Sequence, residues 1–201
     1  QDAFDVVPGR LHVRGGARYG HFAFATRPNL PLGVVQETVN THAFTYQVGT
    51  VATVNRHVDF VFNVSRGFRA PNSSDLGGVG LSGGGGFGIT PSRAAALGGL
   101  VGTTAGTDAV STGQSIPALG PEVMYAYEPG VRVHAGRVES SVTFYDLEYK
   151  NSVQRRAIVF PTNVVGTSIF GFDIVRQDAA GLAYIAQDIR PVGTSINADQ
   201  T

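Results

Sequence analysis

The stretch that decides the fold runs from residue 59 to residue 77 and reads DFVFNVSRGFRAPNSSDLG. Apolar side chains occupy alternate positions: Val58, Phe60, Phe62, Val64 and Phe68. Polar or small residues occupy the positions between them: Asp59, Asn63, Ser65, Gly67 and Arg69. A helix would scatter the phenylalanines around its circumference, whereas a strand places them on one face. We therefore predict a β-strand whose apolar face is broken only by Arg66, and which ends in a polar, glycine-rich segment.

The same alternation recurs along the chain and predicts further strands. The clearest are residues 11–19, 45–54, 123–133 and 138–144, and less regular β-prone segments are 157–160, 168–175 and 182–186. Tight hairpin turns are predicted at Asn55 and at Gly136, because both residue types favour the backbone angles of short turns. The only helical candidate is the alanine-rich stretch 92–97, about a turn and a half. The sequence predicts an all-β, antiparallel fold.

The predicted connections are asymmetric. The hairpins close within a few residues, but the opposite strand ends lead into long stretches, residues 27–36 and above all 71–121. A structureless segment of about fifty residues is uncommon in a compact soluble domain. Short turns on one side and long loops on the other are typical of outer-membrane β-barrels, whose strands need about 9–11 residues to cross the bilayer. In a barrel the apolar face meets lipid, whereas in a soluble β-sandwich the same alternation buries the phenylalanines between two sheets.

The composition excludes several other classes. Fifteen basic and fifteen acidic residues give a formal net charge of zero, which argues against a nucleic-acid binder. The chain has no cysteine, so it has no disulfide and no thiolate metal site. No apolar run approaches the roughly 18 residues of a membrane-spanning helix. The first ten residues lack the features of a signal peptide, so we expect an export signal to be encoded upstream.

Two glycine motifs suggest enzymes but lack the required context. Gly78, Gly80 and Gly83 match G-x-G-x-x-G, and Ser82 lies in a G-x-S-x-G match that Asp108 and His134 follow in hydrolase order. Both motifs need a strand leading into a helix, which the sequence does not offer here. A serine hydrolase using Ser82 is the weakest hypothesis. The five histidines show no metal-ligand spacing, and we predict no catalytic residue, metal or cofactor.

Six charged residues are candidates for contact with a ligand or the lumen. Arg66 and Arg69 lie where the predicted strand emerges, and arginine suits phosphate groups of lipopolysaccharide or of a ligand; plain solvation is the alternative. Glu122 and Glu128 lie six residues apart on one predicted face and could pair with Arg69 or Arg132. The segment 71–121, which contains Asp75, is the candidate for extracellular ligand contact, the alternative being a poorly ordered insertion. The candidates are Arg66, Arg69, Asp75, Glu122, Glu128 and Arg132.

Four stretches carry a family resemblance. They read RLHVRGGARYG (10–20), FNVSRGFRAPNSSDL (62–76), GPEVMYAYEPGVRV (120–133) and VTFYDLEYKNSVQ (142–154). In this order they resemble strands of the barrel domain of TonB-dependent outer-membrane receptors. The third stretch carries the family's Pro-Glu pair, an aromatic residue, Glu and Gly at Pro121, Glu122, Tyr127, Glu128 and Gly130. Pro129 stands where the family more often has leucine, and a proline there requires a strand edge or an irregularity.

The resemblance implies a transmembrane β-barrel with short periplasmic turns and long extracellular loops. It also implies uptake of a bulky, scarce nutrient (a siderophore, cobalamin, another metal complex or a carbohydrate) without catalysis. The implied partners are outer-membrane lipid with lipopolysaccharide, the nutrient, and the TonB complex acting through a plug domain. Family barrels have about 22 strands, but only six to eight strands, no plug and no final aromatic strand are predicted here. We therefore expect residues 1–201 to be an interior part of such a barrel. A soluble adhesin-like or lectin-like sandwich and a passive porin remain alternatives.

Overall fold

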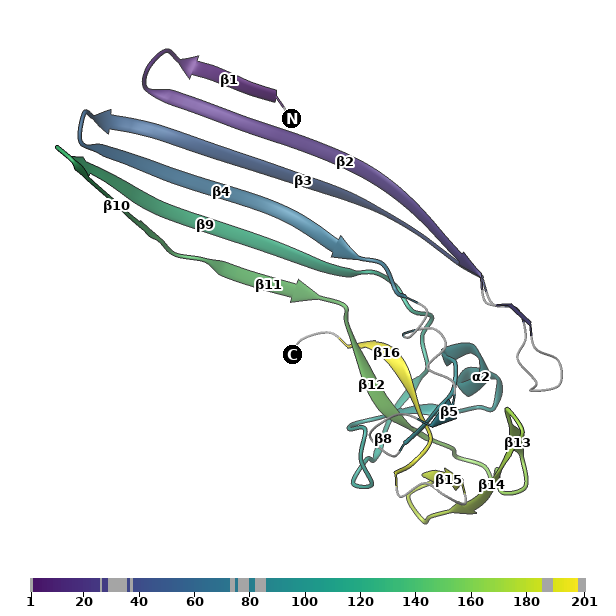
Figure 1. Ribbon diagram of the computed structural model, residues 1–201. Helices are drawn as coiled ribbons and strands as arrows, with labels where there is room; N and C mark the ends of the chain where they lie inside the picture. The colour runs from purple at the N-terminus through teal and green to yellow at the C-terminus, as the bar shows by residue number, and fades with distance from the viewer. Residues whose placement is uncertain are drawn as a thin grey trace.

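The computed structural model describes residues 2–25, 27–28, 36, 38–72, 75, 80–81, 86–185 and 190–198. Two bodies are visible in Figure 1: a long sheet, which we call the wall, and a compact body at one of its ends, which we call the end module. The end module comprises the described residues of 80–121 and 152–198. The wall strands are β1 (Asp2–Val7), β2 (Leu11–Ala25), β3 (Thr38–Asn55), β4 (Val58–Arg69), β9 (Glu122–Ala135), β10 (Val138–Thr143) and β11 (Asp146–Lys150).

The wall is a seven-stranded antiparallel sheet in the order β1-β2-β3-β4-β9-β10, with β11 continuing along β9 beyond β10. The β2–β3 register runs without interruption from Leu11 opposite Ala52 to Ala25 opposite Thr38. β2, β3, β4 and β9 contain 15, 18, 12 and 14 residues, which is longer than the crossing length predicted from the sequence. The described wall strands form an open sheet that does not close on itself (Figure 1).

The hairpin turns of the wall gather at the end away from the end module (Figure 1). The turn between β3 and β4 is closed by Asn55, whose side-chain oxygen accepts a hydrogen bond from the His57 amide at 2.8 Å. The turn between β9 and β10 contains Gly136 at φ +62°, a left-handed angle that glycine adopts without strain. Both predicted turns are therefore confirmed.

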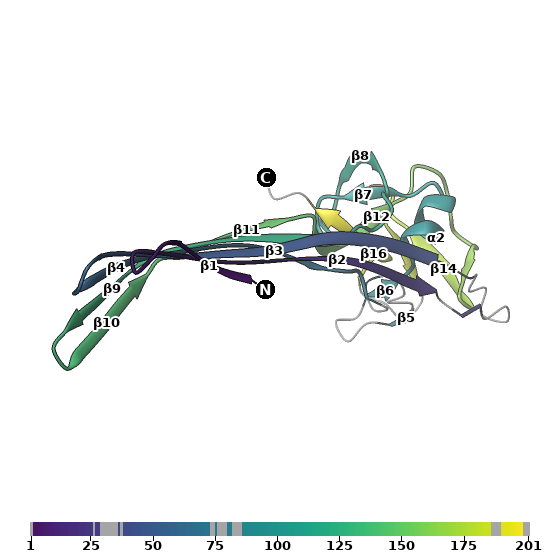
Figure 2. The ribbon, with the colours of Figure 1, turned by 90° about the horizontal axis from the view of Figure 1, so that it is seen from above.

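The wall is one layer thick, as the view in Figure 2 shows. Phe60 and Phe62 are 54% and 44% exposed, so no sheet formed by the described residues covers the apolar face. This contradicts the sandwich prediction, in which these side chains would be buried between sheets. Pro129 lies opposite the break between β10 and β11, where the Phe144 amide donates to its carbonyl at 2.8 Å. The irregularity that a proline in this strand requires is therefore present.

The end module has its own sheets and core. Its larger sheet follows the order β5 (Gly80–Leu81), β6 (Phe87–Gly88), β16 (Gly193–Ala198), β12 (Ser152–Val159), β7 (Leu100–Gly102) and β8 (Ser111–Ser115). A smaller sheet contains β13 (Ser168–Ile169), β14 (Phe172–Gln177) and β15 (Ala183–Ile185). Its most deeply buried large side chains are Phe87, Ile158, Phe160, Ile169, Ile174, Leu182 and Val192. The module is thus a folded body, held by burial of apolar surface.

The predicted helix is present as α2 (Pro91–Ala96), and the side chain of Thr90 caps it by accepting from the Arg93 amide at 3.2 Å. The interpretation of residues 71–121 as a structureless or poorly ordered loop is wrong for residues 86–121. The strands here are two to five residues long, too short for an alternation signal, and β7 pairs with the distant β12. Among the residues that the structure describes, no helix is long and apolar enough to cross a membrane.

Candidate functional site

Cross-strand neighbours in the wall share a face, so the register assigns each side chain to one side of the sheet. On the polar face Asn63 lies opposite Glu128 and donates to its carboxylate at 2.9 Å. Gln47 donates in turn to the Asn63 side-chain oxygen at 3.3 Å. Glu128 is therefore on the predicted face, but its partner is Asn63 and not Arg132.

Arg132 lies nearer the hairpin end of the wall. Its Nε is 3.9 Å from the Glu139 carboxylate, a loose contact between exposed side chains. Next to it, His134 Nε2 lies 3.1 Å from the Asp59 carboxylate. Arg132 and Glu128 line one cavity of the polar face, but Arg132 forms its ion pair with Glu139, and Glu122 lies at the other end of β9.

Arg66 is on the apolar face, two residues before Phe68, the last apolar residue of β4 on that face. Its Nε donates to the Tyr125 hydroxyl at 3.2 Å, and its Nη1 donates to the Phe44 carbonyl. Its guanidinium carbon is 5.7 Å from the centroid of the Tyr125 ring, and Lys150 Nζ is 5.4 Å from the same ring. β11 places Glu148 opposite Tyr125, and this carboxylate is 3.2 Å from Lys150.

The height of the apolar band follows from the length of β4. Strands tilted by about 45° that rise about 3.4 Å per residue span a band about 24 Å tall from Val58 to Phe68. Arg66 therefore lies close to the edge of the apolar band.

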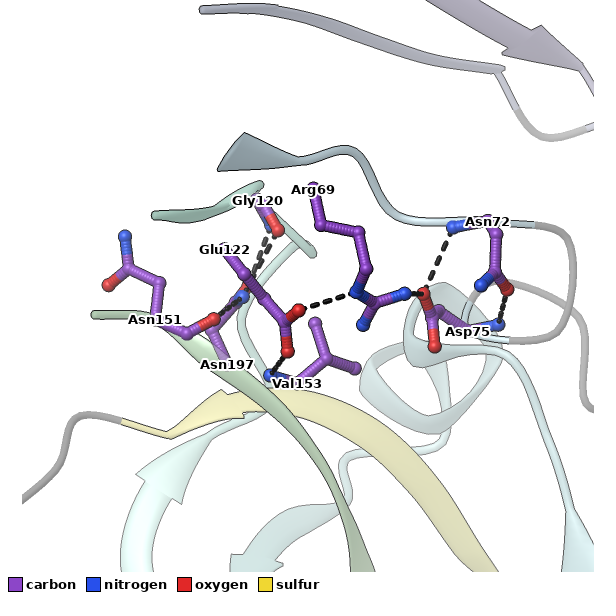
Figure 3. A network of polar contacts seen from close by, with 8 residues as sticks. All are labelled: Arg69, Asn72, Asp75, Gly120, Glu122, Asn151, Val153 and Asn197. Atoms are coloured by element: carbon purple, nitrogen blue, oxygen red, sulfur yellow. Dashed lines mark hydrogen bonds and ion pairs between the residues drawn. The ribbon is translucent and has the colours of Figure 1, made fainter. Parts of the chain in front are cut away.

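The other three candidates meet at the end of β4, where they begin the polar network drawn in Figure 3. Arg69 lies opposite Glu122 and donates through Nε to its carboxylate at 2.5 Å. Its Nη1 donates to Asp75 at 2.7 Å. The Asp75 carboxylate also accepts from the Asn72 amide at 3.0 Å, while the Asp75 amide donates to the Asn72 side chain at 3.0 Å. The predicted pairing of Glu122 with Arg69 is therefore present.

The network continues into the end module. The second oxygen of the Glu122 carboxylate accepts a hydrogen bond from the Val153 amide of β12 at 2.6 Å. Asn197 of β16 exchanges hydrogen bonds with the backbone of Gly120, at 2.6 Å and 3.1 Å, and donates to the Asn151 carbonyl at 2.7 Å. Hydrogen bonds of Glu122 thus link β12, and those of Asn197 link β16, to the segment that enters β9 (Figure 3).

Sequence reasoning missed Asn197, Asn151 and Gly120. Asn151 has φ +55°, and asparagine is among the few residues that adopt such angles readily, so a turn at this point was detectable. Asn197 gave no signal, because its partner Gly120 is 77 residues away in sequence.

The electrostatics of the network support an anchoring role. The side chain of Glu122 is 20% exposed and that of Arg69 is 43% exposed, so the pair lies at the surface with its carboxylate partly sheltered. Each partner also makes a second hydrogen bond, which holds the pair in a defined geometry. Both oxygens of the Glu122 carboxylate accept hydrogen bonds from this chain, one from Arg69 of the wall and one from the Val153 amide of the module. Glu122 therefore joins the wall to the module.

The described residues contain no group of three or more His, Asp or Glu side chains that could hold a metal ion. Ser82 and the glycines Gly78 and Gly83 lie outside the described residues, so the two glycine motifs have no structural account.

The family profile described as "TonB dependent receptor-like, beta-barrel" matches residues 1–200. Searches of curated proteins and of solved structures each returned no match. Members of this family are in general receptors and transporters of the outer membrane rather than enzymes. The antiparallel wall, with one exposed apolar face and one polar face, agrees with that match. The chain belongs to the TonB-dependent receptor β-barrel family.

Proposed function

We propose that the wall crosses the outer membrane of a Gram-negative-type envelope as part of a receptor that takes up a bulky, scarce nutrient. One observation carries the proposal: the wall has an uncovered apolar face on which Phe60 and Phe62 are exposed, and a polar face on which Asn63 and Glu128 are hydrogen-bonded. Such a sheet is stable when lipid covers the apolar face and water or protein fills the polar side.

The arrangement of connections supports an orientation. The hairpin turns of the wall lie at one end and the end module lies at the other (Figure 1). Periplasmic turns are short in such barrels, and extracellular connections are long. The end module, which includes residues 86–121, is therefore the extracellular part and the first contact for the nutrient, which is a siderophore, cobalamin, another metal complex or a carbohydrate. Energy comes from the TonB complex acting on a plug domain.

Arg66 and Lys150 support a contact with lipopolysaccharide. Both cations lie beside Tyr125 on the lipid-facing side, near the edge of the apolar band. Phosphate groups of the outer leaflet lie at this level, and arginine binds phosphate through paired donors. Glu148 beside Lys150 limits the net positive charge, so the contact relies mainly on Arg66.

Surface accessibility tests the proposal. An antibody raised against residues 86–121 should stain intact cells of the source organism, and the antigen should fractionate with the outer membrane. Uptake of candidate nutrients should fall when the gene is deleted and when TonB is deleted. An antigen found in a soluble fraction contradicts the membrane location, and uptake that persists without TonB favours a passive porin.

A further inference from the structure

An apolar cleft of about 350 Å³ lies between the outer end of β3 and the end module. The wall contributes Thr38 and Val39, α2 contributes Pro91, Ser92 and Ala95, and the segment before β9 contributes Ile116, Pro117, Ala118 and Leu119. Pro91, Ile116 and Leu119 are buried, while Ala95 and Ala118 remain exposed. No charged residue occurs among the described residues that line the cleft.

Two adjacent residues of β3, Thr38 and Val39, line the cleft, and adjacent side chains of a strand lie on opposite faces, so the wall reaches the cleft with the end of β3 rather than with one face. The β2–β3 register is unbroken, so Val39 lies on the same face as Gln47, which belongs to the hydrogen-bonded polar row with Asn63. Thr38 lies on the opposite face, the face on which Phe60 and Phe62 are exposed. A solute that approaches along the polar face would meet the Val39 side of the cleft.

We propose that the cleft binds a compact, uncharged group with an apolar or aromatic body, carried by the transported nutrient. Its volume is at the lower end of the range for small-molecule sites, which suits one substituted ring better than a protein segment. A charged group would lose its hydration there without gaining an ionic partner, since no described lining residue is charged and Thr38 and Ser92 are the ones with polar side chains. Any charged or metal-chelating part of the nutrient therefore remains outside the cleft. This inference rests on the proposed uptake function.

Filling the cleft tests the proposal. Ala95→Phe in the full-length receptor places a ring in the cleft from α2, and Ala118→Phe does so from the opposite segment. Ala96→Phe is the matched control, because Ala96 is the next residue of α2, is also exposed, and does not line the cleft. The receptor is held in lipid nanodiscs, and binding of benzyl alcohol and of benzoate is measured by saturation-transfer NMR, with empty nanodiscs subtracted.

We expect benzyl alcohol to bind the parent receptor and Ala96→Phe equally. Its saturation-transfer signal should be at least about fivefold lower with Ala95→Phe and with Ala118→Phe. Benzoate should give a weaker signal throughout. Equal binding by Ala95→Phe and Ala96→Phe overturns the proposal, and so does a benzoate signal as strong as that of benzyl alcohol. A dimer of the parent receptor that Ala95→Phe dissociates also overturns it, because a second copy would then be the occupant.

Staining of intact cells is measured on the same variants, so the two proposals fail separately. If no variant and no parent receptor reaches the cell surface, the uptake function fails. If all reach the surface and none discriminates between the probes, only the assignment of the cleft fails.

Discussion

The Arg69–Glu122 pair is expected to control how firmly the end module is attached to the wall. Glu122 accepts from Arg69 of β4 with one oxygen and from the Val153 amide of β12 with the other, so its removal releases a wall contact and a module contact together. Because Arg69 is 43% exposed, solvent screening limits the ionic part to about 1 kcal/mol, the upper range for surface pairs. The orphaned Val153 amide adds about 1 kcal/mol, the net value of a typical hydrogen bond.

Hydrogen exchange of the peptide covering β12 measures this attachment directly, since local opening exposes the Val153 amide. Arg69→Gln, Glu122→Gln and the double variant form a mutant cycle in the full-length receptor. We expect a coupling of about 1 kcal/mol, equivalent to about a fivefold change in the opening equilibrium. Glu122→Ala should open β12 further than Glu122→Gln, whose amide oxygen can still accept from Val153.

Arg132→Gln is the matched control, because its contact with Glu139 is 3.9 Å between exposed side chains and should leave exchange in β12 unchanged. Additive single effects, with no coupling between Arg69 and Glu122, would refute the anchoring role. Unchanged exchange in Glu122→Ala would refute it as well.

Three further changes test other parts of the structure. Phe62→Arg should reduce the fraction of receptor that is folded in the outer membrane, since a cation at the lipid midplane costs about 2–4 kcal/mol. Asn63→Arg is the control, because residue 63 faces Glu128 on the polar side and the variant should assemble. Equal folded fractions of the two variants would contradict the assignment of the faces. Gly130→Ala should destabilise the wall by about 1–3 kcal/mol in thermal unfolding, because its Cβ would lie 2.8 Å from the Val142 carbonyl oxygen. Gly49→Ala, whose nearest atom is 3.5 Å away, is the control, and equal melting temperatures would contradict the packing. Burial and the hydrogen bond to Asp178 raise the pKa of the Tyr184 phenol above its usual value, so the fold stabilises the protonated form. The stabilisation is complete below the pKa of the phenol in the unfolded chain and is lost as the pH rises through its pKa in the folded protein. Tyr184→Phe should therefore lower the free energy of unfolding by about 1 kcal/mol near neutral pH, and the variant should not lose this contribution at alkaline pH. Parallel pH profiles of the unfolding free energy in the two proteins would contradict the role of the Tyr184 phenol.

The sequence by itself determined the central strands of the wall, although it gave no indication of β1 (Asp2–Val7) and placed the start of β3 at residue 45 instead of Thr38. Alternation along residues 58–69 and 123–133 is a local property, because each residue's face follows from its position in the strand and needs no knowledge of distant partners. The turns at Asn55 and Gly136 were equally local, and the predicted helix was correct to within a residue at each end. The division of each strand into an apolar and a polar face followed from the same periodicity, but only the structure showed that Phe60 and Phe62 are exposed and not buried between two sheets.

Only the tertiary structure decided the end module and the network that holds it. β12 pairs with β7 and β16, which come from separate parts of the chain, so none of these three strands shows a recognisable sequence pattern by itself. Glu122 was a candidate from its sequence position, but its bond to Val153 spans 31 residues, and the bond between Gly120 and Asn197 spans 77. Such contacts depend on how two long excursions of the chain pack together, and local residue preferences carry no information about that packing.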